Sequence, residues 1–463
     1  MSLRDDRQQN IQMHLDFSSA LTGEAREAGR EETEASAATN GTERPASTSR
    51  LMEEVCEREN LKAALRQVKA NKGSPGVDGM TVGGLKDYLK QHWPAIREQL
   101  LNGTYEPKPV RRVEIAKPDG GGVRKLGIPT VLDRFIQQAV MQVLQRRWDR
   151  TFSDHSYGFR PGRSAHQAVA QAQQYIASGH GWCVDLDLEK FFDRVNHDKL
   201  MGQIAKRVED KRLLKLIRAF LNAGVMENGL VSPSVEGTPQ GGPLSPLLSN
   251  LVLSELDREL ERRGHHFVRY ADDCNIYVRS ERAGQRVLEG ITRFITQRLK
   301  LKVNEAKSAV ARPQERKFLG FSFSAGPEVR RVIAPKALDR FKRRVREITR
   351  RAKGVSMETT MEELAPYMRG WRSYFGFCET PEVLIGLTRW VRLRLRAALW
   401  RQWKTPRRRR AALIELGVLP RLASNTAGSG RGPWYLARAK ALSVGLSNAY
   451  FKSLGLPSLF EEC

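Results

Sequence analysis

Residues 266–280 read "HFVRYADDCNIYVRS" and place two adjacent carboxylates, Asp272 and Asp273, between two short runs of apolar and aromatic residues. Residues 267–270 and 276–278 are rich in β-formers, so we predict two strands joined at the acidic pair. Neighbouring side chains of a strand point to opposite faces of a sheet, and the two carboxylates can therefore converge only at the turn. The stretch predicts an acidic site at the tip of a buried hairpin.

A second acidic strand is predicted within "WCVDLDLEKFFDRVNH", residues 182–197. Apolar residues at 184, 186 and 188 alternate with Asp185 and Asp187, which is typical of a strand with one apolar and one acidic face. The pattern then indicates a helix from about Glu189. Asp187 is therefore expected at the carboxyl end of a strand.

Three aspartates at adjacent strand ends can hold two Mg²⁺ ions about 3.5–4 Å apart, an arrangement that stabilises attacking and leaving oxygens in phosphoryl transfer. Carboxylate oxygens are the hard ligands that Mg²⁺ prefers. For an isolated Asp-Asp pair, a solvated turn would be the simpler interpretation. The flanking strands and the second acidic strand favour a metal site.

The charge of the chain indicates a polyanionic partner. Its 463 residues include 78 Lys and Arg against 52 Asp and Glu, a formal net charge of +26. Such a field attracts nucleic acid or an anionic membrane surface. No apolar run reaches the roughly 18 residues of a spanning helix, and the N-terminus lacks the apolar core of a secretion signal. We therefore expect nucleic acid as the partner, no membrane association and a cytoplasmic protein.

The five cysteines lie far apart and include no C-x-x-C pair, so the sequence indicates neither a disulfide framework nor a zinc module.

The composition predicts four segments. Residues 1–50 have few large apolar residues and should form a disordered tail, and a helix is expected from Leu51 to a stop at Gly73. Residues 51–325 mix short strands, helices and glycine turns as an α+β region. Residues 326–410 are helical and basic, and residues 411–463 form a small C-terminal piece.

The basic helices beyond residue 335 suit tracking of a phosphate backbone. One helix is expected to bury an apolar stripe made by Leu338, Phe341, Val345 and Ile348. A second helix is expected to end at Pro406. The arginines that we predict to bind nucleic acid are Arg340, Arg343, Arg344, Arg350, Arg407 and Arg408. Aromatic residues interleave with the arginines, namely Trp371, Tyr374, Trp390, Trp400 and Trp403. Several of them must pack the helices, but together with the density of arginine they favour nucleic acid over a plain solvated face.

Several blocks of the sequence resemble those of one family. "RYADDCNIYV" resembles the YxDD box of reverse transcriptases, and "DLEKFFDRVNHDKL" resembles the block with their first catalytic aspartate. The further blocks "GSPGVDGMTV", "KPDGGGVRKLGIPTVLDRFIQQAV", "YGFRPGRSAHQAV", "GTPQGGPLSPLLSN", "LKVNEAKSAV" and "KFLGFSF" follow the order of bacterial group II intron-encoded reverse transcriptases. "YMRGWRSYFGFC" resembles their maturase domain X. The resemblance implies a right-hand polymerase fold of fingers and palm, residues 51–325, followed by an α-helical thumb or domain X and a C-terminal DNA-binding remnant.

The resemblance also implies roles for single residues. Asp187, Asp272 and Asp273 would be the catalytic metal ligands, whereas Asp185 falls outside the family's catalytic position. Gly320 matches the primer grip. The positions that match nucleotide contacts are Lys117, Arg124, Phe192, Gln240 and Lys307. Each position also has a simpler interpretation. Lys117 and Arg124 fit a solvated loop, and Phe192 fits a core position. Gln240 fits an ordinary Gly-Pro turn, and Lys307 fits a surface lysine.

The function implied is RNA-templated DNA synthesis joined to maturase activity, without an endonuclease module. The implied partners are the parent group II intron RNA, an RNA template with a DNA primer, target DNA and deoxynucleoside triphosphates, with association with the nucleoid when target DNA is bound. Two alternatives remain open. One is a splicing-only maturase with a silent polymerase site, and the other is a retron, diversity-generating or CRISPR-linked reverse transcriptase.

Overall fold

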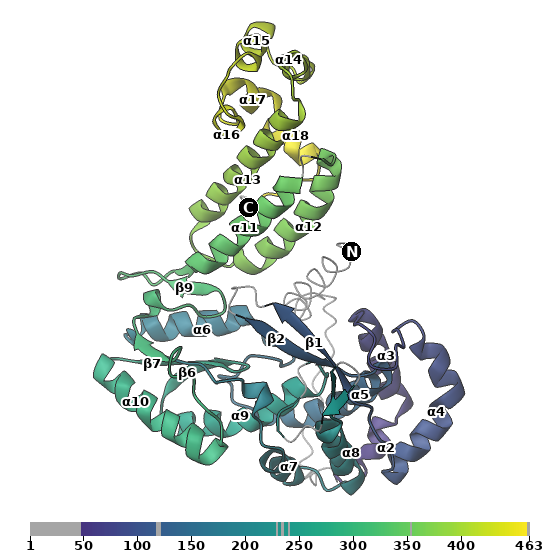
Figure 1. Ribbon diagram of the computed structural model, residues 1–463. Helices are drawn as coiled ribbons and strands as arrows, with labels where there is room; N and C mark the ends of the chain where they lie inside the picture. The colour runs from purple at the N-terminus through teal and green to yellow at the C-terminus, as the bar shows by residue number, and fades with distance from the viewer. Residues whose placement is uncertain are drawn as a thin grey trace, which may run out of the picture. The chain divides into compact units, whose positions relative to one another are not determined.

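The computed structural model describes residues 48–116, 122–227, 230–232, 236–238, 241–351 and 354–460 (Figure 1). The predicted N-terminal tail lies almost entirely outside these ranges. The described chain divides into two compact units, one made of most residues up to Ala311 and the other of the residues from Arg312 onward. In the described residues, no helix is both long and apolar enough to cross a membrane.

A four-stranded antiparallel sheet forms the centre of the first unit. Its strand order is β6 (His266–Tyr270), β7 (Asp273–Val278), β3 (Trp182–Leu186) and β8 (Ala309–Ala311). The predicted hairpin is confirmed, because β6 pairs with β7 and Tyr270 faces Asp273 across a two-residue turn. The predicted alternation in β3 is also confirmed, since Val184 and Leu186 are buried and Asp185 is partly exposed.

Helices bury the apolar side chains of this sheet. α10 (Glu281–Phe294) packs against β3, β7 and β8, and α9 (Ser245–Arg262) packs against β6. In α9 the residues of one broad face are buried, including Leu253, Leu256 and Leu260 at helical spacing. Further helices of this unit include α4 (Leu85–Asn102), α5 (Val131–Trp148), α6 (Ala165–Ala177), α7 (His197–Ala205) and α8 (Lys211–Asn222), and a π-helical segment, Ile295–Leu299, follows α10.

A second sheet of the first unit has the strand order β2, β1, β4 and β5. The bounds are Val123–Ile128 for β2, Val110–Ala116 for β1, Val225–Glu227 for β4 and Leu230–Ser232 for β5. β1 and β2 form an antiparallel hairpin in which Ala116 faces Val123, and β1 pairs with β4 in parallel. This hairpin carries the predicted glycine loop, whose residues 117–121 lie outside the described ranges.

Two helix predictions in this unit are wrong. The helix predicted from Leu51 to Gly73 is two helices, α2 (Leu51–Val55) and α3 (Arg58–Ala70), because the Asn60 side chain donates to the Val55 carbonyl, 3.0 Å away, and to a carbonyl of α5. Residue 189 does not start a helix either. Its amide donates to the Lys302 carbonyl at 2.8 Å, and α7 begins only at His197, after a short 3₁₀ turn at Phe191–Asp193.

The second unit begins with a small hairpin, β9 (Phe321–Phe323) and β10 (Arg331–Ile333), and continues as helices. α11 (Pro335–Arg351) packs against both α12 (Met357–Phe375) and α13 (Pro381–Gln402), and Figure 1 shows these three running side by side. Five short helices follow, namely α14 (Pro406–Glu415), α15 (Pro420–Ala427), α16 (Pro433–Leu436), α17 (Lys440–Gly445) and α18 (Asn448–Ser453).

The apolar stripe predicted for the first basic helix is confirmed in α11. Phe341, Val345 and Ile348 are buried, while Leu338 is partly buried. The second basic helix ends at Gln402 rather than at Pro406, and Pro406 begins α14. The boundary that we predict after residue 410 therefore falls inside α14.

A buried ion pair joins β6 to α9. The Arg269 guanidinium is completely buried, and it donates from Nε to Asp257 Oδ1 at 2.7 Å and from Nη2 to Asp257 Oδ2 at 2.6 Å. Its remaining three N–H groups donate to Asn250 Oδ1, the Ala271 carbonyl and Ser156 Oγ at 2.7–3.0 Å. Every donor of the buried cation therefore has an acceptor, which is the condition for a buried charge to be tolerated.

We expect Arg269→Gln to lower the free energy of unfolding by about 3–5 kcal/mol, because it leaves the buried Asp257 carboxylate without its partner. The double variant Arg269→Met/Asp257→Leu should be clearly more stable than the single variant, since it removes both charges. Denaturant unfolding of the full chain measures both values. As a control, Arg330→Gln breaks an exposed pair with Glu328 and should cost less than about 1 kcal/mol. A double variant no more stable than the single one would contradict this account.

Candidate active site

Strand register brings the three predicted aspartates to one end of the central sheet. Leu186, the last residue of β3, faces Cys274 of β7, so the residue that follows it, Asp187, reaches the level of Asp273. Asp272 occupies the two-residue turn between β6 and β7, beside Ala271, whose φ of 56° is left-handed. The three aspartates therefore lie at the same end of the sheet, where β3 ends and the hairpin turns.

The Asp272 carboxylate lies in an environment that disfavours its charge. Burial raises its pKa above the ordinary value, and the nearby Asp187 carboxylate raises it further. The positive charges of Arg124 and Arg269 act in the opposite direction but do not cancel the effect. An additional cation at this end of the sheet would therefore stabilise the ionised pair.

The segment directly before β8 holds Asp187 in place. The Asp187 amide donates to Ser308 Oγ at 3.0 Å, and its carbonyl accepts from the Asn304 amide at 2.8 Å. Lys307 of the same segment places Nζ 3.4 Å from Asp187 Oδ2. The Lys307 side chain is 63% exposed, so it can reach both the carboxylate and a bound anion. The predicted lysine is thus next to the acidic group.

Residues that the sequence analysis did not single out fix the hairpin turn. Arg269 Nη1 donates to the Ala271 carbonyl at 2.8 Å. A Cβ atom on Gly158 would lie 2.3 Å from the Ala271 amide nitrogen, so only glycine allows this approach. Asn250 in turn donates to the Gly158 carbonyl at 2.8 Å. Gly158 lies in the "YGFRPGRSAHQAV" block, which was the available signal for its role.

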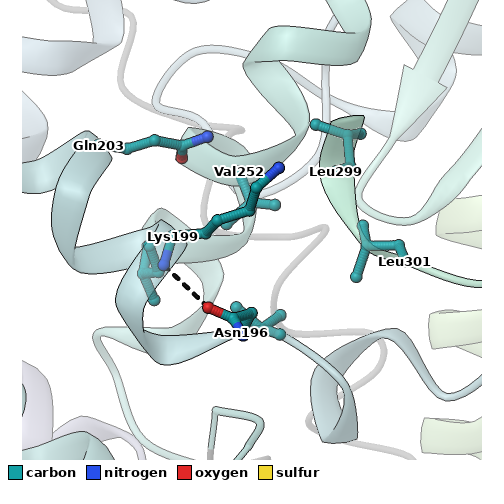
Figure 2. A pocket seen from close by; sticks show the side chains of 8 residues that line it. Asn196, Lys199, Gln203, Val252, Leu299 and Leu301 are labelled. Carbon is teal, nitrogen blue, oxygen red and sulfur yellow. Dashed lines mark hydrogen bonds between the residues drawn. The ribbon is translucent and has the colours of Figure 1, made fainter. Parts of the chain in front are cut away.

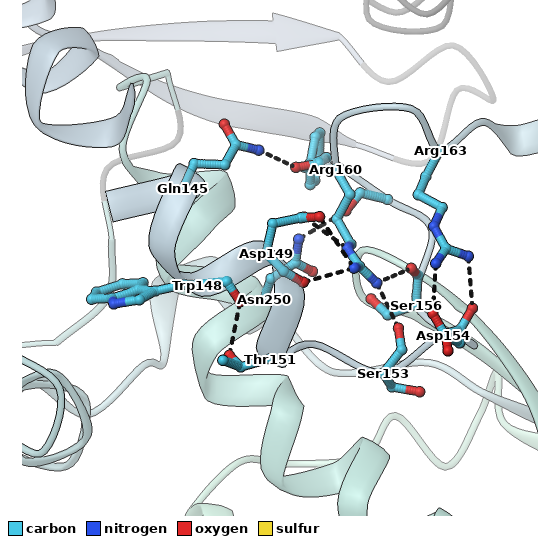
Figure 3. A network of polar contacts seen from close by, with 12 residues as sticks. Gln145, Trp148, Asp149, Thr151, Ser153, Asp154, Ser156, Arg160, Arg163 and Asn250 are labelled. Atoms are coloured by element: carbon cyan, nitrogen blue, oxygen red, sulfur yellow. Dashed lines mark hydrogen bonds and ion pairs between the residues drawn. The ribbon is translucent and has the colours of Figure 1, made fainter. Parts of the chain in front are cut away.

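A polar network stiffens the loop that carries Gly158 (Figure 3). Arg160 donates from Nε to Asp149 Oδ1 at 2.9 Å and from Nη1 to the Ser156 carbonyl at 2.9 Å. Arg163 Nη2 lies 2.6 Å from Asp154 Oδ1. Ser156 also forms a parallel bridge with Arg269 of β6. The loop therefore acts as a fixed extension of the hairpin edge.

Phe192 is half-buried and packs beside Phe191, with 5.2 Å between ring centroids. Its carbonyl accepts from the Thr238 amide at 2.7 Å. A Cβ atom on Gly237, whose φ is 90°, would lie 2.8 Å from the same carbonyl oxygen. Gly237 and Thr238, which begin the "GTPQGGPLSP" block, thus lie against the Phe192 backbone.

The other predicted nucleotide and primer residues have different surroundings. Arg124 is exposed on β2, and its charge acts on Asp272. Lys117 and Gln240 lie outside the described residues. Gly320 belongs to the second unit, where a Cβ atom would be 3.1 Å from the Phe375 ring and the φ of 82° favours glycine. Packing within that unit is enough to explain this glycine.

The predicted nucleic-acid arginines differ in their exposure. Arg343, Arg350, Arg407 and Arg408 are exposed, and Arg340 is partly exposed. Arg344 is only 17% exposed in its side chain, and it pairs with Glu347 at 3.3 Å and Glu363 at 2.9 Å. Trp371 and Trp400 are buried, so they are among the aromatic residues that pack the helices.

In the part of the chain that the structure describes, no group of three or more His, Cys, Asp and Glu side chains is arranged to hold a metal ion. The acidic end of the sheet still fits a divalent cation bound together with substrate. Mg²⁺ is commonly held by one or two carboxylates plus substrate phosphates, and a cation would favour the ionised form of Asp272, whose pKa is raised by burial and by the Asp187 carboxylate. Asp187, Asp272 and the exposed Asp273 supply suitable oxygens.

A narrow cavity of about 10 Å³ lies elsewhere in the first unit (Figure 2). Asn196, Lys199 and Gln203 line it together with apolar residues that include Leu299 and Leu301. Its volume matches about one water molecule, and none of the predicted site residues lines it.

Two families match the chain in succession. Residues 115–323 match the family described as reverse transcriptase (RNA-dependent DNA polymerase), and residues 338–413 match the group II intron maturase-specific domain. The first match contains Asp187, Asp272 and Asp273. Reverse transcriptase domains generally use divalent metal ions.

Two curated proteins are similar to this chain at moderate sequence identity. Protein YkfC of Escherichia coli K12 is 38% identical over 220 residues, 46% of this chain and 58% of the relative. The group II intron-encoded protein LtrA of Lactococcus lactis subsp. cremoris is 31% identical over 323 residues, 56% of this chain and 54% of the relative. The chain thus spans little more than half the length of these curated relatives.

A chain of a solved partial Cas6-RT-Cas1–Cas2 complex is 24% identical, with 53% of this chain and 42% of that chain covered and a TM-score of 0.35. This likeness is too low to bear on the fold. The acidic sheet end and the two domain matches in their order, together with the LtrA match, identify the chain as a member of the group II intron-encoded reverse transcriptase/maturase family.

Proposed function

We propose that the chain is an RNA-directed DNA polymerase that also assists the splicing of its parent group II intron RNA and copies that RNA into DNA. The observation that carries the polymerase proposal is that Asp187, directly after β3, acts electrostatically on Asp272 in the turn between β6 and β7, with the charge of Arg124 also acting on Asp272 and with Lys307 beside Asp187. Carboxylates held together against their own repulsion are suited to metal-dependent phosphoryl transfer.

The proposed cofactor is a pair of Mg²⁺ ions held by Asp187, Asp272 and Asp273. When bound, two such ions would stabilise the attacking and leaving oxygens of an in-line displacement. Other side chains of the protein would position the nucleotide and neutralise the charge of its triphosphate. Lys307 and Arg124, with Lys117 on the hairpin loop, would bind the triphosphate, and Phe192 and Gln240 would contact the sugar.

Successive segments of the chain are proposed to have different roles. Residues 51–325 would form fingers and palm around template, primer and deoxynucleotide, with Gly320 at the primer. Residues 326–410 would form the thumb or domain X that binds intron RNA, and residues 411–463 would contact target DNA. Arg340, Arg343, Arg350, Arg407 and Arg408 are the proposed phosphate contacts. Arg344 is left out because two glutamates already neutralise it. With these partners, the protein would work in the bacterial cytoplasm, at the nucleoid when target DNA is bound.

We expect Asp272→Asn to reduce primer extension on an RNA template by at least about 10³-fold, because it removes a carboxylate from the proposed metal site. Steady-state extension with saturating template, primer and deoxynucleotides measures this. Asp198→Asn is the matched control, since Asp198 is an exposed carboxylate whose side chain is 82% accessible. RNA binding without extension by the unmodified chain would instead identify a maturase with a silent polymerase site.

The same substitution should stabilise the metal-free protein at neutral pH. The pKa of Asp272 is raised in the folded state, so its ionisation costs stability as the pH rises through that pKa. Asp272→Asn removes this cost, and its melting temperature in EDTA should exceed that of the unmodified chain. The difference should disappear in acid, where Asp272 is protonated. A lower melting temperature at neutral pH would mean that the carboxylate is already satisfied by internal partners.

We expect Phe192→Ala to weaken discrimination against ribonucleotides by at least about tenfold, because the ring would no longer clash with a 2′-hydroxyl group. Single-nucleotide incorporation of matched deoxy- and ribonucleotides gives the ratio of kcat/KM. Phe192→Tyr keeps a ring and should keep the discrimination. Unchanged discrimination in Phe192→Ala would show that Phe192 is only a packing residue.

A further inference from the structure

Phe159 has an uncommon backbone conformation beside the acidic end of the central sheet. Its φ is 58°, in the left-handed region, where a bulky residue is disfavoured because its Cβ atom crowds the backbone. Its side chain is nevertheless 38% exposed, whereas its neighbours Gly158 and Arg160 are buried. The ring is too exposed for core packing alone to explain the strain. Strained residues that the surrounding structure maintains are concentrated at functional sites.

The residues around Phe159 fix this conformation. Gly158 lies against the turn between β6 and β7, where a Cβ atom would come within 2.3 Å of a backbone nitrogen. Arg160 donates from Nε to Asp149 Oδ1 at 2.9 Å and from Nη2 to the Asp149 carbonyl at 2.8 Å. The Phe159 carbonyl accepts from Gln145 Nε2 at 3.3 Å (Figure 3). These contacts hold the backbone of Phe159 and leave part of its ring uncovered.

The Phe159 ring lies beside the residues that lead to Asp272. Its centroid is 6.4 Å from that of Tyr270, and the two ring planes are tilted by 44°. Tyr270 is the last residue of β6, and Asp272 follows it by two positions. Among the described residues of the first unit, Phe159 is the only Phe, Tyr or Trp that is exposed to this degree. Aromatic rings contact nucleic acid with little regard to its sequence.

We propose that the Phe159 ring packs in the minor groove of the template–primer hybrid, against the sugars of the base pairs next to the primer 3′ end. The proposal rests on the proposed function and assigns it a substrate-positioning contact. The hybrid is the favoured occupant because the primer 3′ end would react at Asp272, and the newly formed base pairs must lie directly behind that end.

The shape of the hybrid suits such a contact. An A-form helix has a wide, shallow minor groove that exposes its sugars, and its stacked bases present only their edges there. A ring on a fixed backbone loses little conformational entropy when it makes a contact. Phe159 would thereby help to hold the primer 3′ end in line with Asp187 and Asp272.

The test compares Phe159 variants of the full chain in binding an annealed RNA template and DNA primer. We expect Phe159→Ala to weaken binding about tenfold, which is typical for the loss of one aromatic contact with nucleic acid. The slope of log affinity against log salt should not change, because no charge is lost. In primer extension, the KM for template–primer should rise by a similar factor, with kcat changed less than about threefold. Phe159→Tyr keeps a ring and should keep the affinity.

Phe159→Gly separates the role of the ring from the effect of the strain. Like Phe159→Ala it lacks the ring, so it should bind the hybrid equally weakly. Glycine adopts a φ of 58° at no steric cost, and Phe159→Gly should therefore melt at a higher temperature than Phe159→Ala. Leu230→Ala is the matched control, because Leu230 is a 77% exposed apolar residue of the other sheet. It should leave hybrid binding unchanged.

Unchanged hybrid binding by folded Phe159→Ala would overturn the proposal. A reduced salt slope would also overturn it, because the lost contact would then be one with phosphate. Equal melting temperatures of Phe159→Gly and Phe159→Ala would show that the position is not strained and would remove the basis of the proposal. Primer extension by the unmodified chain separates the two claims. Its absence would refute the polymerase proposal, while the binding of the hybrid would still decide whether Phe159 contacts it.

Discussion

The buried Arg269 guanidinium is the contact on which the acidic end of the central sheet depends. It joins helix α9, through Asp257 and Asn250, to the loop at Ser156 and to the turn at Ala271. Because each of its five N–H groups has an acceptor, the geometry of the turn is fixed by charge-assisted hydrogen bonds rather than by apolar packing alone. The backbone at Asp272 is therefore held in a fixed position by its neighbour Ala271, which accepts from Arg269.

This rigidity has an electrostatic consequence. The same structure that fixes Asp272 also buries it and holds it near Asp187, so the pKa of Asp272 is raised. A site that keeps two carboxylates together at a cost in stability is suited to receive a cation, and positioned charge is what phosphoryl transfer requires of a protein.

Local sequence patterns predicted the parts of the structure that local interactions determine. The hairpin around Asp272, the alternating strand that ends at Asp187 and the apolar stripe of α11 all follow from periodicity. The break between α2 and α3 did not, because it depends on Asn60 reaching a carbonyl of α5. The pairing of Arg344 with Glu363 and the burial of Trp400 likewise depend on contacts between helices. The roles of Lys117 and Gln240 stay predictions.

The central claim is that Asp187 and Asp272 share divalent ions in the presence of substrate. Electron paramagnetic resonance of Mn²⁺ tests it most directly, in the complex of the full chain with an RNA template, a chain-terminated DNA primer and the matched deoxynucleotide. We expect two spin-coupled Mn²⁺ ions, about 3.5–4 Å apart, and loss of the coupling in Asp187→Asn. A spectrum of isolated ions that is the same in the unmodified chain and in Asp187→Asn would contradict the account.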